Sequence, residues 1–441
     1  MASFTFYELT DLHTMIESPD ETEEYNKKAR ERGAVRNAVF DYIINDKNVD
    51  TVVISGDNAD HGKYTEHKAF LNDVQRLSDA GKKVYVITAT HDFHIKKVDE
   101  NGESEKEEGV AQRSELPEMY KNFGMSSAIA AFDKYSYVVK PCEGYRILCL
   151  NDDGDGVKFR GYSEAQLKWI EEQAAEAKKS GDIPIVTTHH PVISPSPAYE
   201  FAAPNEMLGN CRKMTEFFAD NGIKYAFTGH THMHSIKKYV SPKGNVFYDI
   251  NTGTLSEYPL KFRKVSFTDD HAEIKTIPIP EVSFETGGKT VGEYYRNLFD
   301  RRILGAVEGL ENDYEYFIQQ AGALSLSRDV LLKVKAPLQM VGKVINHITL
   351  GGVSKLLFIK IDDSIKGILL KDFLADIFRN VYGGDEPYGP ETDEYWAIMA
   401  VLKRFKPVIS KLVKNMTFEE FTAFVGTIIY DPTPDGDAYL E

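Results

Sequence analysis

Short apolar runs alternate with stretches of helical periodicity over the first 280 residues of the chain. Four of the runs are apolar on both faces, as strands buried inside a sheet are: 52–54, 84–87, 183–186 and 225–227. Helical periodicity separates them, and we expect helices over 23–44 and 64–78 and after Ser163, where Gln166 completes a capping-box pattern. This alternation predicts an α/β domain with a largely parallel sheet.

After residue 280 the apolar positions recur with a period of 3.6, which predicts helices. Phe373 and Ile377 mark one such face, and Thr417 with Glu420 forms a capping-box pattern before the last one. The segment Ile277–Pro280, which precedes two consecutive glycines, has the composition of a linker. We therefore predict an α/β domain over 1–280 and an α-helical domain over 281–441.

Composition narrows the class of protein. The 441 residues are 42% hydrophobic and 27% charged, which is typical of a soluble globular chain of two domains. The net charge of −16 argues against extended nucleic acid as a partner. Three cysteines without a CxxC pattern argue against a disulfide framework or a thiolate metal site. The apolar runs are too short for a membrane span and no signal peptide opens the chain, so we expect no membrane partner and a cytoplasmic location.

Candidate chemistry is concentrated in the first domain, where ten of the twelve histidines lie between His13 and His234. Five short motifs each follow a predicted strand: Asp11-Leu-His13, Gly56-Asp57, Thr90-His91-Asp92, His189-His190-Pro191 and Gly229-His230-Thr-His232. Taken singly, each is explained by a turn cap or a structural histidine. Their joint occurrence at strand ends, where α/β sheets bind ligands, indicates a functional site.

Carboxylate and imidazole ligands without thiolate suit Mn, Fe, Zn or Co and do not discriminate among them. Two such ions can clamp a phosphoryl group and generate hydroxide at neutral pH. Because residues two apart on an extended chain point the same way, His230 and His232 can reach neighbouring ions from one loop.

The order of these motifs resembles the calcineurin-like metallophosphoesterases. The resemblance covers about residues 4–275, includes Asp60 and Gly62 in a GDxxDxG pattern, and is greatest to the bacterial class III cyclic-nucleotide phosphodiesterase branch. It implies a four-layer αββα sandwich with a dinuclear metal centre, here followed by the C-terminal α-helical domain.

The resemblance also implies roles for single residues. The first ion would be held by Asp11, His13, Asp57 and His232, and the second by His189 and His230 with Asp57 as the bridge. His189 is preferred over His190 because the family ligand precedes one residue and then proline. His91 would bind no metal but would protonate the leaving oxygen, with Asp92 orienting its ring.

One position departs from the family pattern. The family has Gly-Asn-His-Asp where this chain has Ala89-Thr90-His91-Asp92. The family's asparagine donates a carbonyl oxygen to the second ion, and a neutral threonine hydroxyl is a weaker ligand. We expect Thr90, or a water in its place, at a second ion that is bound more weakly than the first.

The resulting expectation is a phosphodiesterase that hydrolyses a small phosphodiester, such as a cyclic nucleotide, with metal-activated water. A phosphomonoesterase or protein phosphatase is the alternative, and a nuclease is disfavoured by the negative charge. A metal-binding scaffold with little activity is a further alternative, which Thr90 alone favours. The helical domain is a candidate cap, homodimer surface or partner-docking module, and no substrate-binding residue is identifiable.

Overall fold

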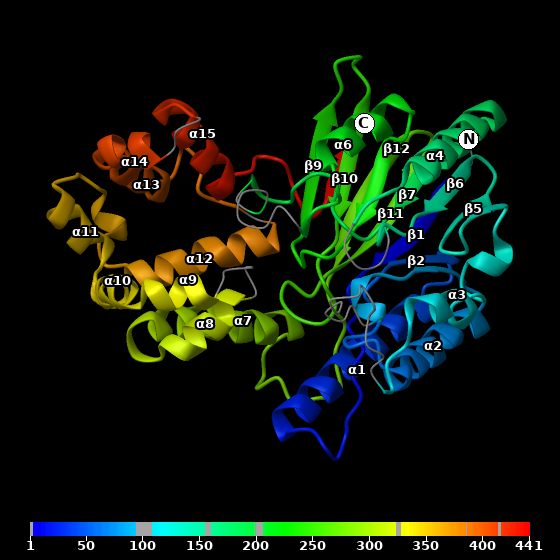
Figure 1. The fold of residues 1–441 in the computed structure, drawn as a ribbon, viewed down its shortest axis with the longest axis horizontal. Coiled ribbons are helices and arrows are strands. Elements are labelled where there is room, and N and C mark those ends of the chain that lie inside the picture. Colours follow the sequence, from blue (N-terminus) through cyan, green and yellow to red (C-terminus); the bar gives the residue numbers. More distant parts are fainter. Residues whose placement is uncertain are drawn as a thin grey trace. The chain divides into compact units, whose positions relative to one another are not determined.

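Two sheets organise the first part of the chain in the computed structural model (Figure 1). The structure describes residues 3–93, 108–154, 160–197, 199, 206–322, 328–384, 386–412 and 416–441. The chain divides into two units: unit 1 contains 1–195, 205–295 and 435–441, and unit 2 contains 196–204 and 296–434. The predicted boundary at residue 280 precedes the division at 295 and 296.

The first sheet has the strand order β13 (Ala438–Leu440), β12 (His271–Ile277), β11 (Phe262–Thr268), β1 (Phe4–Leu9), β2 (Thr51–Ser55) and β3 (Lys83–Ile87). β1, β2 and β3 are parallel, whereas β11, β12 and β13 join them through antiparallel pairs. The parallel strands therefore end at the same edge, where the sequence places three of the five motifs.

The second sheet has the order β4 (Ala130–Phe132), β5 (Ser136–Cys142), β6 (Tyr145–Cys149), β7 (Ile183–Thr187), β8 (Tyr225–Thr228), β10 (Val246–Asn251) and β9 (Ser235–Val240). Its central strands β6, β7, β8 and β10 are parallel, and antiparallel strands flank them. The four predicted strands are confirmed as β2, β3, β7 and β8. Both sheets are mixed, with parallel strands at their centres, whereas the alternation of strands and helices predicted a largely parallel sheet.

Three hydrophobic cores stack the elements of unit 1 into helix, sheet, sheet and helix layers. Phe6 and Val53 point into the core between the sheets, while Tyr7 and Val52 point to the core beneath α1 (Glu23–Asn45), α2 (Tyr64–Asp79) and α3 (Leu116–Met119). A third core joins the second sheet to α4 (Glu164–Ser180) and α6 (Cys211–Asp220). The four-layer αββα sandwich is confirmed, and burial of both faces explains why these strands are apolar throughout.

Side chains cap the helices where the sequence predicts. The Ser163 hydroxyl accepts a hydrogen bond from the backbone N–H of Gln166 at the start of α4. Thr417 and Glu420 form the predicted reciprocal capping box at the start of α15 (Phe418–Ile429). Each cap satisfies backbone N–H groups that the first helical turn leaves unpaired.

The C-terminal region is helical, as the 3.6-residue period predicts. Its helices are α7 (Val291–Asn312), α8 (Tyr314–Gly322), α9 (Arg328–Lys333), α10 (Lys335–His347), α11 (Leu350–Leu357), α12 (Leu370–Gly383), α13 (Asp393–Arg404), α14 (Lys406–Leu412) and α15. The prediction did not include β13, which pairs with β12 of the first sheet and so returns the chain end to unit 1. Within the residues that the structure describes, no helix has the length and apolar character needed to cross a membrane.

Candidate metal centre

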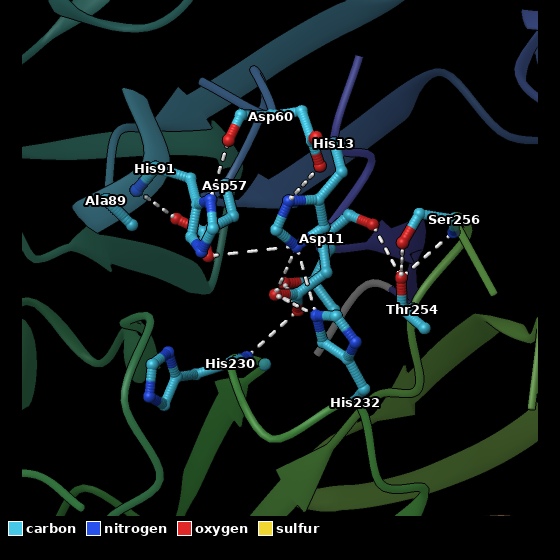
Figure 2. Close-up of polar contacts among 12 residues, drawn as sticks. Asp11, His13, Asp57, Asp60, Ala89, His91, His230, His232, Thr254 and Ser256 are labelled. Atoms are coloured by element: carbon cyan, nitrogen blue, oxygen red, sulfur yellow. Dashed lines mark hydrogen bonds and ion pairs between the residues drawn. The ribbon is translucent and has the colours of Figure 1, made fainter. Parts of the chain in front are cut away.

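The five motifs follow β1, β2, β3, β7 and β8 at the ends of parallel strands. Their side chains come from both sheets, and Figure 2 shows Asp11, His13, Asp57 and His232 close together, with the backbone N–H of His230 donating to Asp11. Three overlapping groups have the chemistry and spacing to hold metal ions: Asp11 with His13 and His232, His13 with Asp57 and His91, and Asp57 with His189 and His230.

The first group forms a tight triangle. The Nε2 atoms of His13 and His232 are 3.0 Å apart, and Oδ1 of Asp11 lies 3.6 Å from the first and 3.4 Å from the second. Metal–nitrogen and metal–oxygen bonds of about 2.0–2.2 Å place neighbouring ligand atoms about 3.0–3.4 Å apart. The three separations are therefore close to those that the ligands of a single ion require.

Buried polar atoms without hydrogen-bond partners point to the same conclusion. Among the described residues, Oδ1 of Asp11, Nε2 of His189 and Nδ1 of His230 are buried and have no hydrogen-bond partner. Buried polar atoms in proteins are normally paired, and an isolated one costs free energy. A cation is the partner that suits a carboxylate oxygen and imidazole nitrogens together, so the site fits metal ions.

Asp57 lies between the two groups. Its Oδ1 accepts a hydrogen bond of 2.9 Å from the backbone N–H of His91. Its Oδ2 is 3.1 Å from Nε2 of His189 and 3.9 Å from Nε2 of His13. One carboxylate oxygen thus faces a histidine of each group, which is the arrangement that a bridging ligand requires.

The histidines and carboxylates shift one another's protonation. Burial alone would raise the pKa of Asp11 and of Asp57, but the surrounding histidines hold the pKa of both carboxyl groups well below the usual value. Burial opposes protonation of His232, yet the nearby carboxylates of Asp11 and Glu257 raise its pKa to about 10. Burial and the neighbouring His190 lower the pKa of His230 to about 3. The group around His230 therefore offers neutral imidazole, whereas the group around His232 binds a proton that a metal must displace.

Two glutamates, which the sequence analysis missed, hold the histidines of the GHTH motif. Oε1 of Glu257 lies 3.0 Å from Nδ1 of His232, so that Nε2 faces Asp11 and His13. Oε2 of Glu206 lies 3.0 Å from Nε2 of His230 and 2.6 Å from the Arg160 guanidinium. The two rings are thus held through opposite nitrogens. No local pattern marks either glutamate, since each reaches the motif from a separate loop.

The backbone of the ligand loops is unusual. Five candidate ligands have a positive φ between 42° and 68°: Asp11, His13, Asp57, His230 and His232. The left-handed region is unfavourable for residues with a β-carbon, and such strain gathers at functional sites. Interlocking bonds hold the loops, with the N–H of Asp11 donating to Gly56 O and that of His13 to Asp57 O.

Two motif glycines allow the loops to approach closely. A β-carbon on Gly56 would lie 2.7 Å from Cβ of Ala89 and 2.9 Å from Nδ1 of His189. A β-carbon on Gly229 would overlap the side chains of Thr10 and Asp11. The glycines in GD and GHTH are therefore needed because the candidate ligands pack directly against the backbone.

His91 lies at the exposed rim of the site. Its Nδ1 is 2.8 Å from the carbonyl oxygen of Asp60, and its ring meets that of His13 edge-on at 4.6 Å between centroids (Figure 2). The expectation that Asp92 orients this ring is wrong. The buried Asp92 carboxylate instead accepts hydrogen bonds from the backbone N–H groups of Asn58, Ala59 and Ala89 and from the Asn58 side chain.

The adjacent histidines His189 and His190 face different carboxylates. His190 bonds to the buried carboxylate of Asp152 through Nδ1 at 2.9 Å, whereas His189 faces Asp57. Thr90 is partly buried in the short 3₁₀ turn Thr90–Asp92. Its assignment to the second ion, like the other ligand assignments, stays a prediction.

A family model for calcineurin-like phosphoesterases matches residues 4–234. The chain belongs to the calcineurin-like phosphoesterase family. This phosphoesterase is thus a hydrolase that acts on phosphoric ester bonds, and its family is typically dependent on two metal ions. No curated protein matches the sequence.

Several solved structures are also similar to part of this chain. A dimetal phosphatase from Danio rerio is 16% identical, with 62% of this chain and 95% of that chain covered and a TM-score of 0.43. A purple acid phosphatase from yellow lupin is 14% identical, with 62% and 51% covered and a TM-score of 0.45. A NAD nucleotidase from Haemophilus influenzae is 13% identical, with 79% and 62% covered and a TM-score of 0.37.

Proposed function

We propose that this phosphoesterase hydrolyses a small phosphodiester, such as a cyclic nucleotide, and lies in the class III cyclic-nucleotide phosphodiesterase branch. The observation that carries the proposal is His91, an exposed imidazole at the rim whose ring is held toward the centre. A diester of this kind releases an alkoxide, which is a poor leaving group unless it receives a proton. The net charge of −16 favours a small substrate over extended nucleic acid.

In this proposal the side chains divide between two ions and the substrate. Asp11, His13, Asp57 and His232 hold the first ion, and Asp57, His189 and His230, with Thr90, hold the second. Ions bound there stabilise charge on the phosphoryl oxygens and supply a nucleophilic water at neutral pH. The mixed oxygen and nitrogen donors suit Mn, Fe, Zn or Co.

His91 carries out the proton transfer. Its Nδ1–H donates to the carbonyl oxygen of Asp60, which fixes the ring and leaves Nε2 to face the centre. Nε2–H gives its proton to the departing alkoxide oxygen, and the neutral ring regains a proton from solvent because it is exposed. The Asp57 carboxylate orients the same loop by accepting the His91 backbone N–H.

Activity on paired substrates tests this function. With Mn supplied, we expect bis-p-nitrophenyl phosphate and a cyclic nucleotide to be hydrolysed with at least tenfold higher kcat/KM than p-nitrophenyl phosphate. Asp57→Asn should abolish hydrolysis of all three, which excludes a contaminating enzyme. A preference for the monoester would make the protein a phosphomonoesterase or protein phosphatase. Full metal loading without turnover of any substrate would instead favour a metal-binding scaffold.

A further inference from the structure

One segment of unit 2 combines basic charge with exposed apolar side chains. Residues 328–360, which form α9, α10 and α11, contain six Lys and Arg and one Asp, so that the segment carries +5 in a chain of net charge −16. α10 and α11 follow one another within the helical unit (Figure 1). We call residues 328–360 the basic apolar segment.

The outward face of α10 is apolar. Met340, Val341 and Val344 are 70%, 46% and 50% exposed and occupy one stripe of the helix. The opposite side already has a partner, because a β-carbon on Gly342 would lie 2.7 Å from Cβ of Leu310 in α7. The exposed stripe is therefore a second apolar face, in addition to the one that packs into unit 2.

The end of α11 presents an aromatic ring to solvent. Phe358 is 89% exposed and adopts φ 56°, the left-handed conformation that glycine usually supplies after a helix. Leu356, two residues earlier, is 64% exposed. Exposure of this ring to water is unfavourable in the isolated chain, so an external partner that buries it would recover free energy that folding does not.

Arg328 forms an ion pair of 2.8 Å with Glu315, whereas four of the other positive charges of the segment are not compensated within the described residues. Lys333, Lys343, Lys355 and Lys360 are all exposed, and within the described ranges none of them forms an ion pair with a carboxylate. Cationic side chains next to an exposed apolar stripe are the composition of helices that lie in a membrane interface. The lysines contact anionic headgroups while the apolar side chains enter the boundary of the acyl layer.

We propose that the basic apolar segment docks this phosphoesterase onto an anionic lipid surface. Two copies of a segment that carries +5 would repel each other, which disfavours self-association through this face. A nucleic acid backbone would attract the lysines but would leave Met340, Val344 and Phe358 in water. An anionic bilayer attracts the lysines and also takes the apolar side chains out of water. The expectation of no membrane partner rested on the lack of a spanning run, and a helix that lies on a bilayer needs none.

Vesicle sedimentation of the full chain tests the proposal. We expect the protein to sediment with phosphatidylcholine vesicles only when phosphatidylglycerol is included, and to be released by high salt because headgroup attraction is screened. Neither metal loading nor turnover enters this measurement, so its outcome is independent of the proposed function. Equal sedimentation with neutral vesicles, or none with either, would overturn the proposal.

Variants of exposed residues locate the contact. Phe358→Gly should weaken binding roughly tenfold by removing a buried ring, while keeping the fold because glycine prefers this conformation. The double variant Lys333→Gln with Lys343→Gln should weaken vesicle binding about 25-fold, about fivefold for each lysine. Val240→Ser, which removes a 53% exposed apolar residue from β9, is the matched control and should change nothing.

Two other outcomes would assign the segment to a different partner. If sedimentation velocity showed a dimer that Phe358→Gly dissociates, without vesicle binding, the occupant would be a second copy. If an RNA or DNA oligomer bound and the lysine variants abolished that binding while vesicles failed to bind, the partner would be a nucleic acid. Either result refutes the lipid assignment.

Discussion

Glu257 and Glu206 contact the two histidines of the GHTH motif. Replacing either glutamate should lower the affinity of the protein for one of the two metal ions. Glu257 holds His232 through Nδ1, and Glu206 holds His230 through Nε2. Partners of this kind fix the orientation of a metal-binding ring and are typically worth 10–100-fold in metal affinity. Glu257→Ala should therefore weaken the ion near Asp11, and Glu206→Ala the ion near Asp57.

The magnitude follows from the hydrogen bond that is lost. A hydrogen bond to a charged group contributes roughly 1.5–3 kcal/mol, which corresponds to a factor of about 10–150 in affinity. A second effect opposes this loss for Glu257. That carboxylate helps to raise the pKa of His232 to about 10, so its removal lowers the pKa and reduces competition by protons. The loss of affinity should therefore be largest near pH 9, where competition is weak, and smaller near pH 6.

Cobalt titration followed by visible absorbance, with elemental analysis after dialysis, measures both ions. Glu257→Gln keeps an oxygen acceptor and should lose less than Glu257→Ala. Glu206→Ala provides the reciprocal comparison, and no pH dependence of its loss is expected from His230, whose pKa of about 3 leaves the ring neutral. Equal weakening of both ions by each variant, or a Glu257→Ala loss that grows toward low pH, would refute this reasoning.

Four further predictions follow from the same contacts. His91→Ala should lower kcat by roughly 10²–10⁴ with metal content retained, and a loss of half the metal would make His91 a ligand. Thr90→Asn should tighten the second ion in dialysis experiments, because an amide carbonyl is a better donor than an un-ionised hydroxyl; equal retention of both ions by the wild type would contradict this. Metal uptake at pH 7 should release a proton from His232, measurable by calorimetry in buffers of different ionisation enthalpy. Burial opposes ionisation of Asp46, but hydrogen bonds from Lys264 and Tyr7 lower its pKa from 3.8 to about 2. The ionised Asp46 carboxylate therefore stabilises the fold above pH 4, and this contribution is lost as the pH falls through 2. In Asp46→Asn, the free energy of unfolding measured in urea should therefore change less over that range.

The amino-acid sequence alone determined the elements and most of the candidate ligands. Runs such as 52–54 and 183–186 are apolar on both faces because they are buried between two layers, and this pattern is local. Helix caps such as Ser163 are local for the same reason. The motifs were recognisable because each follows a strand directly, so that the order along the chain already places them at one edge.

The tertiary structure decided which side chains hold those ligands. Glu257 and Glu206 reach the histidines from separate loops, and no spacing along the chain encodes those contacts. Asp92 was assigned by adjacency to His91, but its carboxylate turns inward to backbone N–H groups. β13 was missed because three residues carry too little pattern to identify a strand that pairs with distant β12. Local patterns determine elements because they depend on neighbours in sequence, whereas hydrogen bonds between loops depend on how the two sheets pack.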